Sequence, residues 1–505
     1  GVAAVLAVAL RFVGPHGLWL DEALTVNISR LPLPRLFDAL RHDGSPPAYY
    51  VALHFWMGLF GTGTGTVRAL AGLFSVATIP VAWRLGRAVG GHRVATALVI
   101  LVACNPFALR YGTENRMYSL VMLLATVAGL CLLRALQRPT TVRLFAFGAT
   151  CGLLLLTHYW ALYLVAGLGC CLAAASVWGP VRAHARPALA ALCGGCLLFV
   201  PWAPSFLFQA QHTGTPWATA ASPMMLIDAV GEFAGWEQHS GIAVFVAYCV
   251  VLGILAIALV MRSIPAARGL ADAIGWKRPV PGARLAAPIA VLFFVTMFLA
   301  MVGGMVAGAA FAYRYASVVM PFVLLLVALG VVAVDRTRPG RVAAVVILAA
   351  LAVLGAIAGV QEIVSPRTQA LIVAADIAAN ANPGDIVAYC PDQLGPAVSR
   401  LLPNRLLTQV TYPRFDDPQR INWVDYAQVN QSANPGVFAR QILNLAGSHQ
   451  IWLVWEGGYR TLGRSCQEIR DALEVARPGH SQPVKSSPQY LSLIHISEPT
   501  RQAEI

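Results

Sequence analysis

Two short segments near the start of the chain carry neighbouring groups that could do acid–base chemistry. The segment WLDEAL places the carboxylates of Asp21 and Glu22 side by side, and HDGSPPAYY carries His42 and Asp43. A carboxylate held at the edge of an apolar region can accept a proton, and a neighbouring one can hold a hydroxyl group or a metal ion. We therefore predict that Asp21 and Glu22 are catalytic and that His42 and Asp43 bind substrate.

Cationic and aromatic groups follow further along the chain. The segment RYGTENRMY contains Glu114, Arg116 and Tyr118, while His158 ends one apolar run and Arg314 begins another. A planar guanidinium group matches the oxygens of a phosphate or pyrophosphate. Arg116 and Arg314 are therefore the best candidates for a phosphate site, and we predict that Glu114, Tyr118 and His158 bind substrate with them.

Each of these groups also has an ordinary explanation. The two carboxylates of WLDEAL could be a solvated helix start, because acidic residues favour the first turn of a helix. Arg116 and Glu114 could form a plain ion pair, and Arg314 could be a snorkelling anchor at a membrane surface. His158 could be an interfacial histidine with satisfied hydrogen bonds. The functional interpretation depends on all of them lying on one side of the same structure.

Composition indicates which structure must position these groups. The 505 residues are 57% hydrophobic and 12% charged, with a mean hydropathy of +0.65, whereas soluble proteins carry about 25% charged residues. Apolar runs of about 20 residues cross the hydrocarbon of a bilayer. We predict a polytopic α-helical membrane protein with about eleven spans, near residues 1–13, 68–83, 94–109, 117–133, 144–157, 160–178, 187–206, 241–261, 285–310, 316–334 and 342–361.

The distribution of basic residues predicts the orientation. The short aromatic run 47–60 is interpreted as an interfacial helix, because Tyr and Trp favour the headgroup layer. The loop Arg and Lys residues then divide 16 to 7 between the two sides, and the richer side is cytoplasmic by the positive-inside rule. All the polar groups named above fall on the outer side. The net charge of +13 lies mainly in these loops, so nucleic acid is not an expected partner.

The composition changes after about residue 364. In residues 365–490, GDIVAYC followed by QLGPAVSRLL, and HQIWLVW followed by CQEIRDALEVA, each indicate a strand and then a helix. We predict a small extracytoplasmic α/β domain after a membrane domain of residues 1–364. Cys390 and Cys466 are its two cysteines; an oxidising exterior would allow a disulfide, but their spacing does not show that they are close.

Both ends of the chain need separate treatment. The chain begins at Gly1 within an apolar run, so we expect its natural N-terminus to be missing. Residues 491–505, LSLIHISEPTRQAEI, look like translated sequencing adapter and are excluded from the fold.

The same segments resemble a known family. WLDEAL, DGSPPAYYVALHFWMGLFG, VRALAGLFSVATIPVAWRLGRAVGG and NPFALRYGTENRMYSL, in this order, resemble the dolichyl-phosphate-mannose–protein mannosyltransferase-like family of the GT-C superfamily. Bacterial aminoarabinose and Rgt-type lipopolysaccharide sugar transferases are its relatives. THYWALYLV, FVPWAPSFLFQAQ and RYASVVMPFVLLL extend the resemblance over residues 15–335.

The resemblance implies an enzyme that takes a sugar from a polyprenyl-phosphate donor and inverts the anomeric centre. It assigns the catalytic carboxylate to Asp21, with Glu22 beside it, and implies a cell-envelope lipid, glycan or protein as acceptor. It also implies a multi-pass protein of the bacterial cytoplasmic membrane, with the active site outside. Members of the family differ in metal dependence. No metal-ligand cluster stands out in this sequence, so we expect no certain cofactor, and a divalent metal stays open.

Two other classes of protein remain as alternatives. A transporter or a sensor could carry an outer ligand-binding domain, but a transporter would be expected to show an internal repeat and ionisable residues at mid-span. Neither is apparent in the sequence. A polysaccharide polymerase or ligase would use the same lipid-linked substrates and would still be an enzyme.

Overall fold

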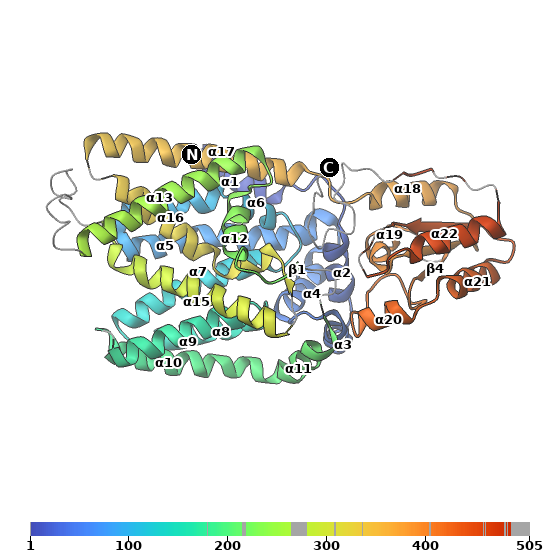
Figure 1. Cartoon of the computed structure of the whole chain (residues 1–505), viewed down its shortest axis with the longest axis horizontal. Helices are drawn as coiled ribbons and strands as arrows, with labels where there is room; N and C mark the ends of the chain where they lie inside the picture. The colour runs from blue at the N-terminus through green and yellow to red at the C-terminus, as the bar shows by residue number, and fades with distance from the viewer. Residues whose placement is uncertain are drawn as a thin grey trace.

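The computed structural model describes residues 2–178, 180–214, 219–263, 280–307, 310–335, 337–402, 406–457, 459, 461–478, 481 and 483–485. Figure 1 shows two parts along the long axis, a helical bundle built by the chain up to α17 and a smaller α/β part built from α18 onwards. The excluded tail 491–505 and most of the predicted loop between the spans 241–261 and 285–310 lie outside the described residues.

Long apolar helices build the bundle. Among the described residues, seven helical stretches are long and apolar enough to cross a membrane. They are α5 (Thr64–Cys104), α7 (Tyr118–Gln137), α9 (Ala161–Trp178), α10 (Arg182–Cys196) continued by η2 (Leu197–Trp202) and α11 (Ala203–His212), α13 (His239–Ser263), α15 (Ala283–Ala307) and α17 (Arg338–Val364).

Shorter helices complete this part of the chain. They are α1 (Val2–Ala9), η1 (Leu10–Phe12), α2 (Leu20–Ser29), α3 (Leu33–Asp43), α4 (Ala48–Phe60), α6 (Pro106–Gly112), α8 (Thr141–Leu155), α12 (Met225–Ala234), η3 (Tyr313–Val318) and α16 (Met320–Val334). Strands β1 (Thr219–Ala220) and β2 (Ala310–Phe311) pair antiparallel. The polytopic helical fold is confirmed, while the count of eleven spans stays a prediction because α8 and α16 are shorter than a full crossing.

Helix α5 contains two of the predicted spans. Its backbone is non-helical at Gly90 and Gly91, and Gly91 has a φ of 77°, a conformation that favours glycine. The two arms pack closely, since a Cβ on Gly86 would lie 2.5 Å from the Cα of Ala95. The predicted span 94–109 was wrong at its end, because the second arm stops at Cys104. There the Asn105 side chain accepts a hydrogen bond from the Ala108 amide, 2.8 Å away, and caps the separate helix α6.

A buried arginine donates hydrogen bonds to carbonyl groups in the last turn of α5. The guanidinium of Arg11 is fully buried and donates to the carbonyl oxygens of Val102 and Ala103, at 3.0 and 3.2 Å, and to Ser75 Oγ at 2.8 Å. Helix C-termini leave carbonyl groups without an intrahelical partner, and these bonds fill that need. Arg11 therefore holds η1 against the bundle.

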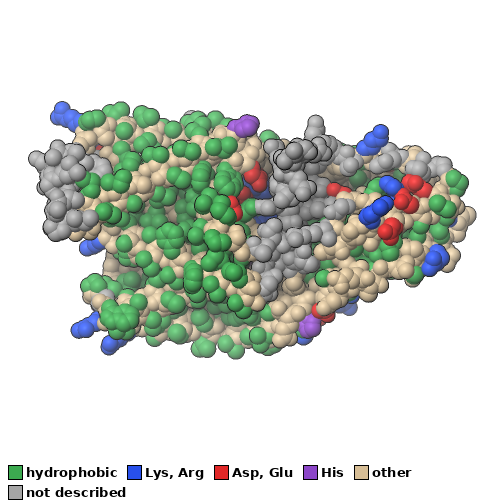
Figure 2. All heavy atoms as spheres, viewed as in Figure 1, with side chains coloured by type: hydrophobic (Ala, Val, Ile, Leu, Met, Phe, Trp, Pro, Cys, Tyr) green, Lys and Arg blue, Asp and Glu red, His purple; other side chains and the backbone are tan. Residues whose placement is uncertain are grey.

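The outer surface of the bundle is apolar. Figure 2 shows hydrophobic side chains over most of the bundle. Its Lys and Arg side chains gather at the far end, which is the end away from the α/β part. Large apolar side chains such as Phe145 and Val306 are exposed there, at 75% and 83%, as expected for a surface that contacts lipid. At the far end, Arg93 and Arg341 both pair with Asp335, which agrees with the predicted grouping of these basic residues on one side.

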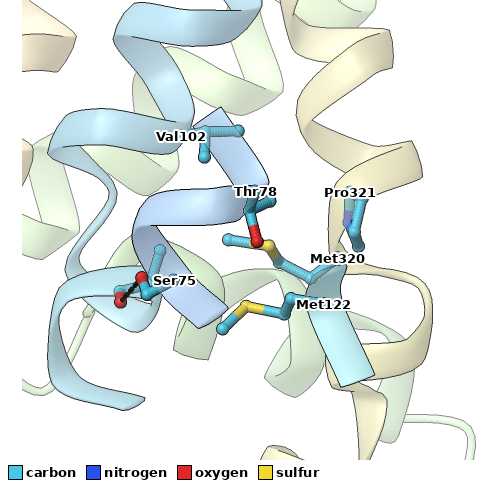
Figure 3. A pocket seen from close by; sticks show the side chains of 7 residues that line it. Ser75, Thr78, Val102, Met122, Met320 and Pro321 are labelled. Atoms are coloured by element: carbon cyan, nitrogen blue, oxygen red, sulfur yellow. Dashed lines mark hydrogen bonds between the residues drawn. The ribbon is translucent and has the colours of Figure 1, made fainter. Parts of the chain in front are cut away.

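One small cavity lies inside the bundle. Figure 3 shows Ser75, Thr78, Met122 and Met320 among the residues that line it. The volume of the cavity is about 10 Å³, roughly the room for one water molecule. The hydroxyl of Ser75 is already bonded to the carbonyl oxygen of Ala108, at 3.2 Å. This space is too small for a sugar or a lipid.

The α/β part is a three-stranded parallel sheet with helices around it. The strands β3 (Ile386–Cys390), β4 (Thr408–Thr411) and β5 (Ile451–Trp455) are ordered β4-β3-β5, with Ile386 paired to both Thr408 and Ile451. Around them lie α18 (Ala370–Asn380), η4 (Asp392–Leu394), α19 (Gly395–Ser399), α20 (Tyr426–Ser432), α21 (Pro435–Ala446) and α22 (Ser465–Ala476). The predicted strand–helix pairs are confirmed, and β4 is an additional strand.

A disulfide ties this part together. Cys390, the last residue of β3, is bonded to Cys466 at the start of α22. The sequence left this pairing open, because 76 residues separate the two cysteines. The bond links the central strand to the last helix.

Candidate active site

Asp21 lies between two arginines that come from distant parts of the chain. It stands in the first turn of α2 and is 8% exposed. The Nε of Arg116 and the Nη2 of Arg314 lie 3.9 and 3.8 Å from its Oδ2. Three of the groups predicted from sequence are therefore brought together at the end of the bundle that carries the α/β part (Figure 1). The carboxylates of WLDEAL do start a helix, but this helix is buried rather than solvated.

Arg116 is oriented by the turn and helices around it. Its Nη1 donates to Thr25 Oγ1 at 2.8 Å, to the Tyr50 hydroxyl at 3.3 Å and to the Asp21 carbonyl oxygen at 3.4 Å. Residues 113–117, which carry it, form no regular helix, so its side chain can reach α2 and α4 at once. These bonds point the guanidinium at Asp21.

Asp43 belongs to the same cluster. The Tyr50 hydroxyl donates to its Oδ2 at 3.1 Å, and Tyr50 is also bonded to Arg116. Burial raises the pKa of the Asp43 carboxyl, the Arg116 charge opposes the rise, and the Asp21 charge adds to it. The structure therefore places two carboxylates and two guanidiniums in one polar cluster.

Glu22 faces the protein interior and has all its acceptor positions in use. It is fully buried, and Arg68 Nε and Nη2 donate to its two oxygens at 2.7 and 2.6 Å. The Asn115 amide donates to Oε1 at 2.8 Å. Burial alone would raise the pKa of Glu22, but the Arg68 charge and these hydrogen bonds lower it. These bonds give Glu22 a structural role, and its catalytic role stays a prediction.

Glu114 is paired as well, but not with Arg116. Its Oε2 accepts a hydrogen bond from Arg367, which lies between α17 and α18. Burial raises the pKa of Glu114, and the Arg367 charge lowers it. The pair fixes the connection between bundle and α/β part against the turn that carries Arg116, and substrate binding by Glu114 stays a prediction.

An aromatic wall adjoins Arg314. The rings of Tyr118 and Tyr315 lie 5.7 and 5.2 Å from the His158 ring, centroid to centroid. Burial, together with the charges of Arg116 and Arg314, lowers the pKa of His158 to about 3. His158 is therefore neutral, and its Nδ1 accepts the Trp160 amide at 3.1 Å. Tyr118 and His158 lie where the sequence predicts.

His42 does not lie with the cluster around Asp21. Its Nδ1 is bonded to the Asp38 carbonyl oxygen one turn earlier in α3, at 2.8 Å, and its ring contacts Phe208. The structure therefore does not bring His42 together with its neighbour Asp43, and substrate binding by His42 stays a prediction. Its carbonyl oxygen instead accepts the Trp423 amide from the α/β part.

The pairing residues Arg68 and Arg367, and Thr25 and Tyr50 beside Arg116, were missed as site residues. A buried glutamate needs a cationic partner. This rule predicts that a partner exists, but it does not identify the residue that supplies it. Within the described ranges, no group of three or more His, Cys, Asp or Glu side chains is arranged to hold a metal ion.

Comparison with known proteins identifies a related family and fold. Residues 44–205 match the family described as dolichyl-phosphate-mannose-protein mannosyltransferase, which confirms the resemblance predicted from the sequence. No curated protein matches the chain.

Solved structures share the fold over most of the chain. ArnT from Cupriavidus metallidurans in the apo state is 17% identical, with a TM-score of 0.55, over 83% of this chain and 86% of ArnT. The same protein bound to undecaprenyl phosphate is 15% identical, with a TM-score of 0.54, over 82% and 86%. The Archaeoglobus fulgidus oligosaccharyltransferase in the apo form is 11% identical, with a TM-score of 0.55, over 89% and 68%.

Proposed function

We propose that this chain, a multi-pass membrane protein with the GT-C glycosyltransferase fold, transfers a sugar from a polyprenyl-phosphate donor to a hydroxyl group of a cell-envelope acceptor. The observation that carries the proposal is the Asp21 carboxylate between the guanidiniums of Arg116 and Arg314. A base beside two phosphate-binding cations is the arrangement that such a transfer needs.

The chemical step is a single displacement. The acceptor oxygen attacks the anomeric carbon, its proton passes to the Asp21 carboxylate, and the bond from the anomeric carbon to the phosphate oxygen breaks. The electron pair of that bond leaves on the phosphate, so the products are the glycosylated acceptor and polyprenyl phosphate. Attack from the face opposite the leaving group inverts the anomeric centre. Asp21 is the catalytic base.

Arg116 and Arg314 bind the donor phosphate. The two guanidiniums lie 3.9 and 3.8 Å from the Asp21 carboxylate, beyond hydrogen-bonding distance. They can therefore turn to a phosphate of the donor while the Asp21 carboxylate stays beside the sugar. Their charge stabilises the leaving phosphate, which is the role that a divalent metal would otherwise serve. ArnT, which shares the fold, binds undecaprenyl phosphate, and this supports a lipid of that class.

The neighbouring residues position the sugar. The Tyr50 hydroxyl accepts a hydrogen bond from Arg116 and donates one to Asp43. Asp43 and Tyr50 also present polar atoms to a sugar hydroxyl. The rings of Tyr118, His158 and Tyr315 offer apolar faces of the kind that pack against a sugar. Glu22 and Glu114 stabilise the site through Arg68 and Arg367.

The enzyme assignment is tested with lipid-linked sugars. The purified chain in nanodiscs is mixed with undecaprenyl phosphate carrying radiolabelled mannose, glucose, arabinose or aminoarabinose, and with total lipid and glycan extract of a bacterial envelope. We expect label to move to the extract with release of undecaprenyl phosphate. If none of the four donors loses its label, and proteoliposomes instead take up one of them, the chain is a transporter.

Arg116 and Arg314 should affect the donor more than the acceptor. Replacing either with Ala removes charged hydrogen bonds to phosphate, and we expect the apparent KM for the lipid donor to rise about 10- to 100-fold. Arg-to-Lys should recover only part of this, because Lys binds phosphate as a point charge. Undecaprenyl phosphate should raise the Tm of the wild type and not of Arg116→Ala. An unchanged donor KM in both Ala variants would contradict the phosphate site.

We propose that the site and the α/β part face the cell exterior. The 16-to-7 division of basic residues and the Cys390–Cys466 disulfide support this, since disulfides persist outside the cytoplasm. In a chain whose free cysteines are replaced, Asp38→Cys on α3 and Val475→Cys on α22 should react with a membrane-impermeant maleimide in intact cells. Pro139→Cys, between α7 and α8, should not. The opposite labelling would overturn the orientation.

A further inference from the structure

A second polar cluster lies at the carboxyl edge of the outer sheet. Asp392 and Gln393 follow β3, Arg414 follows β4 and Tyr459 follows β5. Since the three strands are parallel, the segments that follow them leave from the same edge. In open parallel sheets this edge is where ligands bind.

The cluster is buried and only partly satisfied. The Tyr426 hydroxyl donates to Asp392 Oδ1 at 2.5 Å, and Gln393 Nε2 donates to the Tyr426 hydroxyl at 2.7 Å. Gln393 Oε1, Arg414 Nε and the Tyr459 hydroxyl have no hydrogen-bond partner in the part of the chain that the structure describes, and Gln393 and Tyr459 are 0% and 2% exposed. Buried polar atoms are nearly always paired, so three open positions in one cluster point to a ligand.

This edge faces the end of the bundle that carries Asp21. Helix α19, just after the β3 edge, packs on α2, and Asn27 of α2 donates to the Gln419 carbonyl oxygen at 2.8 Å. The Trp423 amide donates to the His42 carbonyl oxygen at 3.1 Å. Figure 1 shows α19 beside α2 at this junction.

We propose that Asp392, Gln393, Tyr426 and Tyr459 bind the acceptor, and that the acceptor group is a carbohydrate. This inference rests on the proposed function and adds the acceptor class to it. The amide oxygen of Gln393 accepts a hydrogen bond from a sugar hydroxyl, and the Tyr459 hydroxyl both donates and accepts.

Aromatic rings complete the proposed acceptor site. The Trp423 ring packs on Tyr426, with centroids 5.0 Å apart, and the pair supplies an apolar face next to the polar atoms. In this proposal the acceptor bound at the sheet edge presents its hydroxyl to the base at Asp21, across the junction where α19 packs on α2.

The test is direct binding of simple saccharides to the full chain in nanodiscs. Saturation-transfer NMR is recorded with methyl α-mannopyranoside, methyl β-glucopyranoside, methyl β-galactopyranoside and methyl α-arabinofuranoside. We expect at least one to receive saturation from the wild type. Tyr459→Phe and Gln393→Leu should each lower that signal about five-fold, the loss expected for one hydrogen bond. Tyr389→Phe is the matched control, because its hydroxyl bonds to Gln409 within the sheet, and it should keep the signal.

Two outcomes overturn this inference, and neither coincides with failure of the proposed function. The inference fails if none of the four saccharides receives saturation, or if the signal persists in the double variant Tyr459→Phe, Gln393→Leu. Asp21→Asn should keep saccharide binding, because Asp21 belongs to the other cluster. Loss of transfer with retained binding therefore separates the two sites, whereas absence of transfer in the wild type would count against the proposed function alone.

Discussion

Replacing Asp21 by Asn is expected to lower the rate of sugar transfer by a factor of about 10²–10⁴, the range for loss of a positioned general base. The amide keeps the size of the side chain but cannot accept the proton of the acceptor hydroxyl. The Tm in detergent should fall less than it does on loss of the 2.6 Å Glu22–Arg68 pair, because the pairs of Asp21 with Arg116 and Arg314 are 3.9 and 3.8 Å long.

Asp38→Asn is the matched control for this change. Asp38 is exposed on α3, close in sequence to Asp21 but outside the cluster, and its replacement should leave transfer unchanged. Both variants are measured with the same lipid donor under single-turnover conditions, so that product release does not limit the rate. Near-normal transfer by Asp21→Asn would remove Asp21 from the reaction.

Replacing Glu22 by Gln should reduce stability far more than any exposed carboxylate replacement does. It leaves the Arg68 guanidinium buried without its counter-charge, and removing one partner of a buried pair costs about 3–5 kcal/mol. Arg68 and Glu22 have side chains 11% and 0% exposed, so solvent screens the pair little. The free energy of unfolding can be measured by pulse proteolysis in urea. The double variant Glu22→Leu, Arg68→Met should recover part of the loss.

Asp335→Asn supplies the comparison at the other end of the bundle. Its partners Arg93 and Arg341 are 53% and 63% exposed, and such surface pairs contribute about 0–1 kcal/mol. If Glu22→Gln keeps the free energy of unfolding of the wild type and loses sugar transfer instead, Glu22 acts in the reaction and the structural assignment is wrong.

The Glu22 pair also predicts how stability changes with pH. The Glu22 pKa is lower in the folded chain than in the unfolded one. Its contribution is therefore complete above the usual pKa of a glutamate, about 4.3, and is lost as the pH falls through the lowered value. Glu22→Gln should remove this part of the acid dependence.

Much of the architecture could be predicted from local patterns. Apolar runs of helix-spanning length marked α7, α9, α13, α15 and α17, and strand–helix patterns marked β3 and β5. The end of the span at residues 94–109 could not be placed by hydropathy, since the Asn105–Pro106 break interrupts a run that stays apolar. Capping chemistry, not hydrophobicity, decided that boundary.

The site was predictable as a set of segments but not as a set of contacts. Grouping polar residues on one side of the membrane brought Asp21, Arg116 and Arg314 together correctly. This grouping could not assign different roles to Asp21 and Glu22. Their environments differ because Glu22 pairs with Arg68, which lies 46 residues further along the chain. The partner of Glu114 is 253 residues away, so neighbouring charges in the sequence suggested Arg116 instead.

The most direct measurement is a density map of the chain in nanodiscs with bound undecaprenyl phosphate. We expect the phosphate within hydrogen-bonding distance of both Arg116 and Arg314, next to the Asp21 carboxylate and at the end of the bundle that carries the α/β part. Phosphate density bound elsewhere, with both guanidiniums turned to protein carboxylates, would contradict a donor site at Asp21.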